Sequence, residues 1–356
     1  MSLTSLLLAG AISSTGLLLC LDENARSLEA KAVDAYHVGD YRNSELLHRQ
    51  AIQSSTVQEP ELAVAWSNLG LAIFQQGRYA EAEQAFARAL SLQEALGGES
   101  DPALAKTLNN LALVQRAQGR TLEARATLQR TLDLENRTAG IDPRVLAATT
   151  ASLGAVYYDL GQYATAERLF QQSLTWMENA GDEGGRAATL GYLARFEMGR
   201  KDFAAAETRL GDALGIRERL FGPDHPKTAE TRTALAQVRS LEGKDVEAEA
   251  GFRQAIEALE RSGGDGNPQL SSPLLRYADH LRRQGRYDDA VSLYRRSLQV
   301  LAGRQDDILP ELYTGYAEVL RKTHRNRESN EYMAKAKALL DESPSRHTVD
   351  VSAFRQ

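Results

Sequence analysis

Residues 65–90 read AWSNLGLAIFQQGRYAEAEQAFARAL, and this stretch holds two apolar stripes separated by Gly77. Residues at offsets of three and four share one face of a helix. Before the glycine the stripe is Trp66, Leu69, Gly70 and Ile73, and after it the stripe is Ala82, Phe86, Ala89 and Leu90. The stretch therefore predicts two amphipathic helices joined by a tight turn.

The same pattern recurs along the chain. A small residue that follows the turn appears eight times, at Ser44, Ala82, Ala124, Ala166, Ala206, Ala248, Ala290 and Ser329. A glycine usually precedes it by five residues and an aromatic residue by three, although Lys201 replaces one glycine and His324 another. Glycine can take the left-handed conformation that ends a helix, and a small residue lets two helices approach closely. The pattern predicts about eight helix pairs.

A second motif separates the repeated units. It reads Gly98-Glu-Ser-Asp-Pro102, Gly140-Ile-Asp-Pro143, Gly222-Pro-Asp-His-Pro226 and Gly264-Asp-Gly-Asn-Pro268. The glycine ends one helix, and the proline keeps the preceding residue extended before the next helix begins. One such pair cannot bury its apolar face alone, whereas stacked pairs can. We therefore expect one repeat array over residues 25–340.

The composition fits an all-α protein and excludes some partners. Alanine and leucine dominate the apolar residues, and both favour helices over strands. The formal net charge of −6 gives no reason to expect nucleic acid, which binds basic surfaces. Because Cys20 is the one cysteine, neither an intramolecular disulfide nor a cysteine-based zinc site can form.

The two ends of the chain lack the repeat pattern. Residues 3–21 carry no charge and would span about 28 Å as a helix, so residues 1–24 are expected to be a signal-like leader or anchor. A basic region before this segment and a cleavage site after it are missing, so a first helix packed on the repeats stays open. The balance slightly favours an exported or membrane-tethered protein. The tail at 341–356 is expected to fray.

The sequence resembles the tetratricopeptide-repeat family, in the 42-residue variety found in kinesin light chains. The resemblance rests on residues 65–90, on TLNNLALVQRAQGRTLEA from Thr107 and on ALGIRERLFGPDHPKTAETRTALA from Ala213. It implies a right-handed superhelical solenoid of antiparallel helix pairs, in which first helices line a concave groove. The motif is specific for this fold and not for any partner.

No pattern indicates catalysis. The sequence contains no HExxH helix, GxxxxGK[ST] loop, GxSxG elbow or EF-hand loop, and its six histidines are scattered. The glycine-rich stretch 263–266 has no preceding strand or following lysine, so we interpret it as a connector. We therefore expect no enzyme activity, no metal and no cofactor.

The resemblance implies a peptide site on the first helices. The candidate groove residues in the first half are Asn68, Leu71, Phe74, Lys106, Asn109, Asn110, Leu113, Tyr158 and Tyr192. Asn68 and Asn110 are equivalent in adjacent repeats, and an amide pairs with both backbone donors and acceptors. Kinesin light chains and chaperone-binding relatives use asparagines in this way. Alternatively, these are ordinary surface residues, or Phe74 and Tyr158 pack between repeats.

A basic group in the last third is a second candidate. Arg276, Arg282 and Arg283 would suit an acidic segment or a peptide carboxylate, although a solvated surface explains them equally well. The lysine–arginine clamp of chaperone-tail binders is incomplete, because Asn110 follows Lys106 where an arginine is needed.

These features favour a non-catalytic scaffold that binds a protein or peptide. One alternative is a structural or assembly factor that self-associates or organises an envelope complex. Another is a regulator that senses a peptide. The membrane would be involved only through an uncleaved apolar leader.

Overall fold

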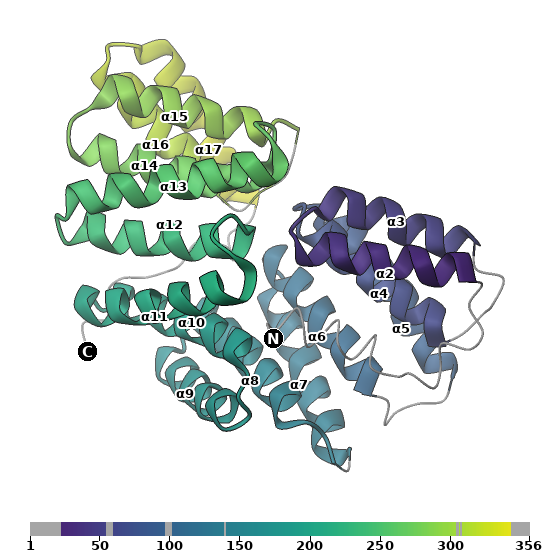
Figure 1. Cartoon of the computed structure of the whole chain (residues 1–356). Helices are drawn as coiled ribbons and strands as arrows, with labels where there is room; N and C mark the ends of the chain where they lie inside the picture. The colour runs from purple at the N-terminus through teal and green to yellow at the C-terminus, as the bar shows by residue number, and fades with distance from the viewer. Residues whose placement is uncertain are drawn as a thin grey trace. The chain divides into compact units, whose positions relative to one another are not determined.

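The computed structural model supports the predicted all-α architecture. It describes residues 23–54, 60–96, 102–138, 140–303, 306 and 308–342. In these ranges the regular structure consists of sixteen α-helices and one short 3-10 helix, and the α-helices follow one another as eight pairs (Figure 1). Residues 1–22 of the expected leader (1–24), the Gly98 turn and residues 343–356 of the expected tail (341–356) lie outside the described residues, while residues 23–24 begin α2 and residues 341–342 end α17.

The chain divides into two compact units, and unit 1 covers residues Met1–Leu193. The second helices α3, α5 and α7 each pack against their own first helix and against the first helix of the next pair, and α9 packs against α8. The helices of unit 1 are α2 (Glu23–His37), α3 (Tyr41–Ser54), α4 (Pro60–Phe74), α5 (Tyr79–Ala95), α6 (Pro102–Ala117), α7 (Thr121–Arg137), α8 (Pro143–Asp159), α9 (Tyr163–Asn179) and the first part of α10 (Glu183–Gly199).

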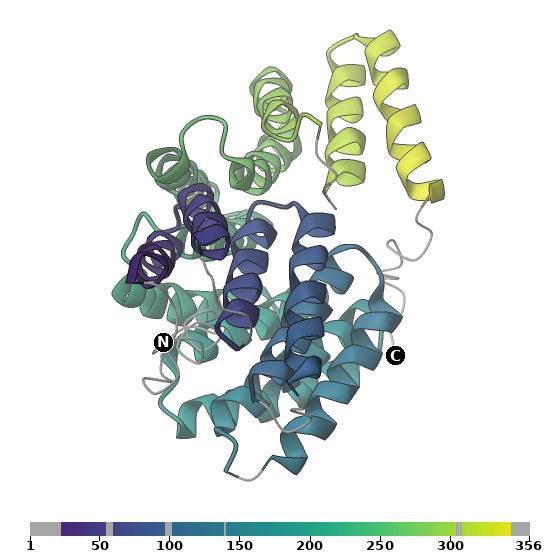
Figure 2. The same cartoon turned by 90° about the vertical axis from the view of Figure 1, so that its right-hand side faces the viewer.

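Unit 2 covers Ala194–Gln356 and repeats the same arrangement. Its last pair lies side by side in Figure 2, where it is drawn in yellow. The elements of unit 2 are the rest of α10, α11 (Phe203–Phe221), α12 (Pro226–Leu241), α13 (Asp245–Gly263), η2 (Pro268–Leu270), α14 (Ser271–Arg283), α15 (Tyr287–Val300), α16 (Leu309–Lys322) and α17 (Asn326–Glu342).

The turns adopt the left-handed backbone that the glycine pattern predicts. Gly77 and Gly161 both have φ of 73° at the end of their first helices. Lys201 and His324, which replace glycine in two repeats, adopt the same region with φ of 63° and 61°. The turn is therefore kept by the surrounding helices even where the residue disfavours it.

Unit 1 packs two glycines directly against aromatic rings. A Cβ added to Gly70 would lie 2.8 Å from the ring of Phe86, and one added to Gly154 would lie 2.9 Å from the ring of Phe170. Both phenylalanines are buried. The glycine of the first helix and the aromatic residue of the second therefore set the spacing within each pair.

A ladder of ion pairs connects successive second helices. In four repeats the basic residue just before the second helix pairs with a glutamate of the preceding second helix, and we call these contacts the inter-repeat rungs. In unit 1 the rungs are Arg78–Glu45 and Arg120–Glu83, both at 2.6 Å; in unit 2 they are Lys244–Glu207 at 2.5 Å and Arg286–Glu249 at 2.6 Å. Because the side chains are partly exposed, water and salt screen these pairs, and each rung contributes little to the stability of the fold.

The part of the chain that the structure describes holds no helix long and apolar enough to cross a membrane.

Candidate functional site

The three candidate asparagines of unit 1 lie on first helices and are buried. Asn68 is on α4, while Asn109 and Asn110 are on α6, where each is 2% exposed. The Oδ1 atoms of Asn109 and Asn110 accept no hydrogen bond from the described residues. Both oxygens therefore have unused capacity to accept a hydrogen bond. Leaving a buried polar atom unsatisfied costs about 1–3 kcal/mol.

The candidate apolar residues pack within unit 1. Leu71 is 3% exposed and lies in the core beside Val114. Phe74 rests on Tyr79 at a centroid distance of 5.5 Å, and Tyr158 rests on Tyr163 at 5.3 Å. Both rings therefore pack across the turn of their own repeat, rather than between repeats as the alternative interpretation had it, and both remain partly exposed.

Two more candidates, Lys106 and Leu113, are half-buried on α6. The pKa of Asp142 lies below its usual range, mainly because of the hydrogen bond from the Arg144 side chain and to a smaller extent because of the charge of Lys106. Lys106 therefore contributes positive charge near the start of α8.

Tyr192, the candidate on α10, is partly buried and has an aromatic and a cationic neighbour. Phe170 stacks on it at 5.1 Å with an interplanar angle of 8°, and the guanidinium of Arg116 lies 6.0 Å from its centroid. Arg116 is held by Asp159, with its Nε 2.5 Å from Oδ2. Burial acts to lower the pKa of Arg116, but the charges and hydrogen bonds of Asp159 and Tyr192 together outweigh burial and raise that pKa. The sequence analysis missed Arg116, although it stands one 42-residue repeat after Phe74.

Two of the three candidate arginines in unit 2 are paired with carboxylates on the next repeat. Arg276 of α14 donates from Nη2 to Glu311 of α16 at 2.8 Å. Arg282 donates to Glu318, also on α16, at 2.7 Å. The guanidinium groups thus tie α14 to α16 in the described structure.

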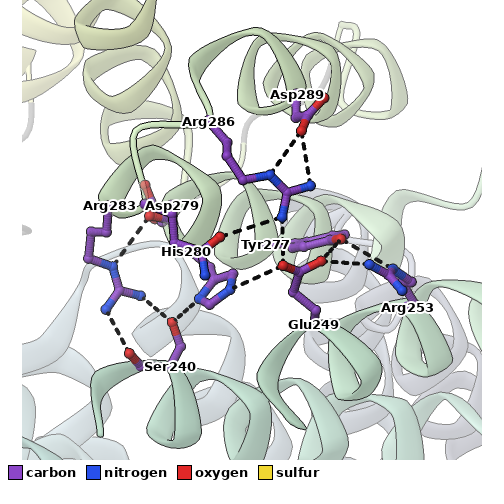
Figure 3. Close-up of polar contacts among 10 residues, drawn as sticks. Ser240, Glu249, Arg253, Tyr277, Asp279, His280, Arg283, Arg286 and Asp289 are labelled. Carbon is purple, nitrogen blue, oxygen red and sulfur yellow. Dashed lines mark hydrogen bonds and ion pairs between the residues drawn. The ribbon is translucent and has the colours of Figure 1, made fainter. Parts of the chain in front are cut away.

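The third arginine, Arg283, begins a network that crosses three helices (Figure 3). Its Nη2 donates to Ser240 Oγ on α12 at 2.9 Å, and that oxygen lies 2.5 Å from Nδ1 of His280. On the other side of the imidazole, Nε2 is 4.0 Å from a carboxylate oxygen of Glu249 on α13. Burial lowers the pKa of His280, which favours the neutral ring.

Glu249 is the centre of the same network in Figure 3. Its carboxylate accepts from Tyr277 Oη at 2.9 Å and from Arg253 and Arg286 at 2.6 Å each. Burial acts to raise the pKa of Glu249, but these donors and charges outweigh burial and hold the pKa below its usual value.

Serine, histidine and carboxylate in a row is also the order of a nucleophilic triad. Ser240, however, is only 7% exposed, and its Oγ is held by Arg283. We therefore assign the network to the packing of α12, α13 and α14. The described residues contain no group of three or more histidine, cysteine or acidic side chains placed to hold a metal.

Comparisons with known proteins identify the repeat. A family model described as tetratricopeptide repeat matches residues 61–136, 185–261 and 241–302, more than half of the chain, and a second model of that description matches residues 146–175. No protein with a curated description matches the sequence.

Three solved structures are similar to the chain to different degrees. A Rap protein complexed with Competence and Sporulation Factor is 14% identical, with 97% of each chain covered and a TM-score of 0.68. The Rap conjugation gene regulator of plasmid pLS20, in complex with the Phr* peptide, is 16% identical over 89% of this chain and 87% of that one, with a TM-score of 0.63. A putative kinesin light chain of Podosopora anserina with TPR-like repeats is 19% identical, covering 56% of this chain and 94% of that one, with a TM-score of 0.41.

The helix pairs, the left-handed turns and the matched residues lead to one conclusion. The chain belongs to the tetratricopeptide repeat family.

Proposed function

We propose that the protein is a non-catalytic scaffold that binds an extended peptide or protein segment on the first helices of unit 1. The binding residues are Asn68, Asn109 and Asn110, flanked by Phe74, Leu113 and Tyr158. An extended segment exposes backbone N–H and C=O groups that amide side chains can pair with.

The observation that carries the proposal is the unused hydrogen-bonding capacity of α6. The Oδ1 atoms of Asn109 and Asn110 are buried without a donor among the described residues. A ligand N–H bound there would recover part of the cost of leaving the oxygens unsatisfied. The partly exposed rings of Phe74 and Tyr158 would add apolar area on the adjacent repeats.

Charge has a smaller role in this proposal. Arg116 already pairs with Asp159, and Arg276 and Arg282 already pair with Glu311 and Glu318. An acidic ligand would have to displace these carboxylates. Arg283 of unit 2 donates its described hydrogen bonds to Ser240 and to a backbone oxygen, both uncharged, as part of the network that packs α12, α13 and α14.

A peptide-sensing regulator is the second candidate function. It is favoured by the likeness over nearly the whole chain to a Rap protein crystallised with Competence and Sporulation Factor, together with the likeness to a Rap regulator bound to the Phr* peptide. In that case the bound segment would be a short free peptide rather than part of a partner protein.

Peptides selected from a random display library against the wild-type protein would test the scaffold proposal. We expect the Asn68→Ala/Asn110→Ala double variant to bind the selected peptides at least about tenfold more weakly, because two amide hydrogen bonds are lost. Fluorescence anisotropy with labelled peptides gives the dissociation constants.

The matched control replaces two exposed amides on second helices of unit 1, Gln50→Ala/Gln172→Ala. This control should keep the wild-type affinity, and all three proteins should show the same helical circular dichroism. Equal affinities of the wild type and the Asn68→Ala/Asn110→Ala variant would contradict the proposal.

A further inference from the structure

Glu135 is a carboxyl group buried at the junction of α7 and α8. Its side chain is 0% exposed in the last turns of α7. One oxygen, Oε1, accepts a hydrogen bond of 2.7 Å from Thr149 of α8, while Oε2 is buried and has no partner among the described residues. A buried carboxylate normally needs several donors or a cation, and this one has a single neutral donor.

Equivalent positions in other repeats show that Glu135 stands at a core position. Four of the equivalent positions, each fourteen residues after the first residue of its second helix, are buried. They are Gln93 on α5, Met177 on α9, Leu259 on α13 and, just after α15, Leu301. The repeat therefore accepts apolar side chains here, and Gln93 shows that it accepts the neutral isostere of glutamate.

Arg217 is the one other charged residue found at this position among the described repeats, and it has several polar partners. Arg217 of α11 donates to Thr231, the equivalent of Thr149, at 2.6 Å. It also reaches Glu230 at 3.2 Å and the backbone oxygen of Lys227 at 2.7 Å. Arg217 therefore has a counter-charge and several acceptors, neither of which Glu135 has.

The charged groups on the helices packed against α7 are engaged elsewhere. On α6 and α8 these groups are Lys106, Arg116, Arg144 and Asp159. Arg116 pairs with Asp159, Arg144 pairs with Asp142, and the charge of Lys106 acts on Asp142 as well. On α7 itself the nearest charges, Asp133 and Arg137, are exposed, and Arg130 pairs with Glu94 of α5. No described cation lies within ion-pair distance of Glu135.

We propose that Glu135 makes the α7–α8 junction a proton-sensitive joint of unit 1. The joint closes when the carboxyl group is protonated and loosens when it is ionised. This device does not depend on the proposed peptide site, although α6 and α8 carry several of that site's residues.

The direction follows from linkage between protonation and opening. Burial raises the pKa of Glu135 to about 7, against the opposing effect of the Thr149 hydrogen bond. In the open joint the carboxyl group meets water, and its pKa returns towards the ordinary 4.5. The closed joint therefore binds the proton more tightly, so its stability is full below pH 4.5 and is lost as the pH rises through about 7.

Hydrogen exchange followed by mass spectrometry on the full chain tests the proposal. Peptides from α7 and α8 are compared between wild type and Glu135→Gln at each pH, which cancels the intrinsic pH dependence of exchange. We expect the opening equilibrium of the wild type, relative to the variant, to increase by about 30-fold between about pH 5.5 and about pH 8. Peptides from α14 and α15 should show no difference.

Two further variants keep the test decisive. Glu135→Met copies Met177 and should behave as Glu135→Gln does, so the test survives if the glutamine variant folds poorly. Gln93→Glu should give the α5–α6 junction the same pH dependence, since Gln93 is also buried. Wild-type and Glu135→Gln proteins whose exchange follows the same pH profile would overturn the proposal.

Discussion

Replacing Phe86 with alanine is expected to lower the free energy of unfolding of unit 1 by about 3–5 kcal/mol. Phe86 is fully buried on α5, and its ring lies against Gly70 of α4. The neighbouring core residues Leu69 and Ile73 cannot fill the space that the ring leaves, because their helix is fixed by its contacts with α5 and α3.

Enlarging Gly70 tests the same contact from the side of α4. A methyl group on Gly70 would lie 2.8–3.0 Å from three ring atoms of Phe86, so Gly70→Ala should cost about 1–3 kcal/mol. In a Phe86→Leu background the aromatic ring edge is gone, and the added cost of Gly70→Ala should fall to less than about 1 kcal/mol.

Urea denaturation followed by circular dichroism measures the four free energies of this double-mutant cycle. Ala87→Gly, at an exposed position of α5, is the control and should cost only the helix-propensity difference of about 1 kcal/mol. Additive effects of Gly70→Ala and Phe86→Leu would mean that the ring does not set the spacing of α4 and α5.

The second large effect is expected at Tyr294 of α15 in unit 2. Its buried ring lies against Gly315 of α16, and its hydroxyl group donates to Asp279 of α14 at 2.6 Å. Tyr294→Ala removes both interactions and should cost at least about 3–5 kcal/mol. Tyr294→Phe removes the hydroxyl group alone and should cost about 1–3 kcal/mol.

The pH dependence separates the hydroxyl group from the ring. Burial raises the pKa of Asp279, and the hydrogen bond from Tyr294 opposes that rise. Without the hydroxyl group the pKa of Asp279 in the folded protein rises further, so more stability is lost as the pH increases through it. The difference between wild type and Tyr294→Phe should therefore be larger near neutral pH than in mild acid.

Thermal melts of the wild type, Tyr294→Phe and Tyr287→Phe at two pH values provide this measurement. Tyr287 is partly exposed on the same helix, so its variant should stay within about 0.5 kcal/mol of wild type at both pH values. A Tyr294→Phe penalty that is equal at both would show that Asp279 is not the partner that matters.

The fold could be predicted because its decisive signals are local. Each repeat is marked by a glycine at the turn and by a small residue three positions after an aromatic residue, and both signals lie within a few residues of the turn. The structure has left-handed backbone at the turn glycines Gly77, Gly161, Gly243 and Gly285. One predicted helix boundary, the start of α14, differs from the structure. Pro268 was expected to begin a first helix, but it begins a short 3-10 turn capped by Asn267, and α14 starts at Ser271.

The candidate site was harder to predict because its residues contact partners far away in the sequence. Helical spacing gives the face of a first helix that meets its own second helix. It does not show that α6 also packs against α4, α5 and α8, which bury Asn109 and Asn110. Leu71 is buried for a similar reason, since it lies in a core cluster with Val114 of α6.

Ion pairing was the other property that spacing could not reveal. Arg276 and Glu311 are 35 residues apart, on the first helices of neighbouring repeats, and only the stacking of α14 on α16 brings them together. Arg276 and Arg282, which the sequence suggested as a basic site, are therefore neutralised by carboxylates in the structure. Arg283 is the exception among the three candidates.

The inter-repeat rungs bear on how such a chain can change its length during evolution. Each rung joins one residue from a repeat to one residue from the repeat before it, so a deletion of one whole repeat leaves a complete rung behind. Removal of residues 79–120 would join Arg78 to Thr121. Arg78 would keep Glu45 and meet Glu123 three residues later, as it now meets Glu81. Loss or duplication of this 42-residue unit would thus preserve a rung at Glu45, whereas a deletion that removed Arg78 without supplying another basic residue in its place would break it.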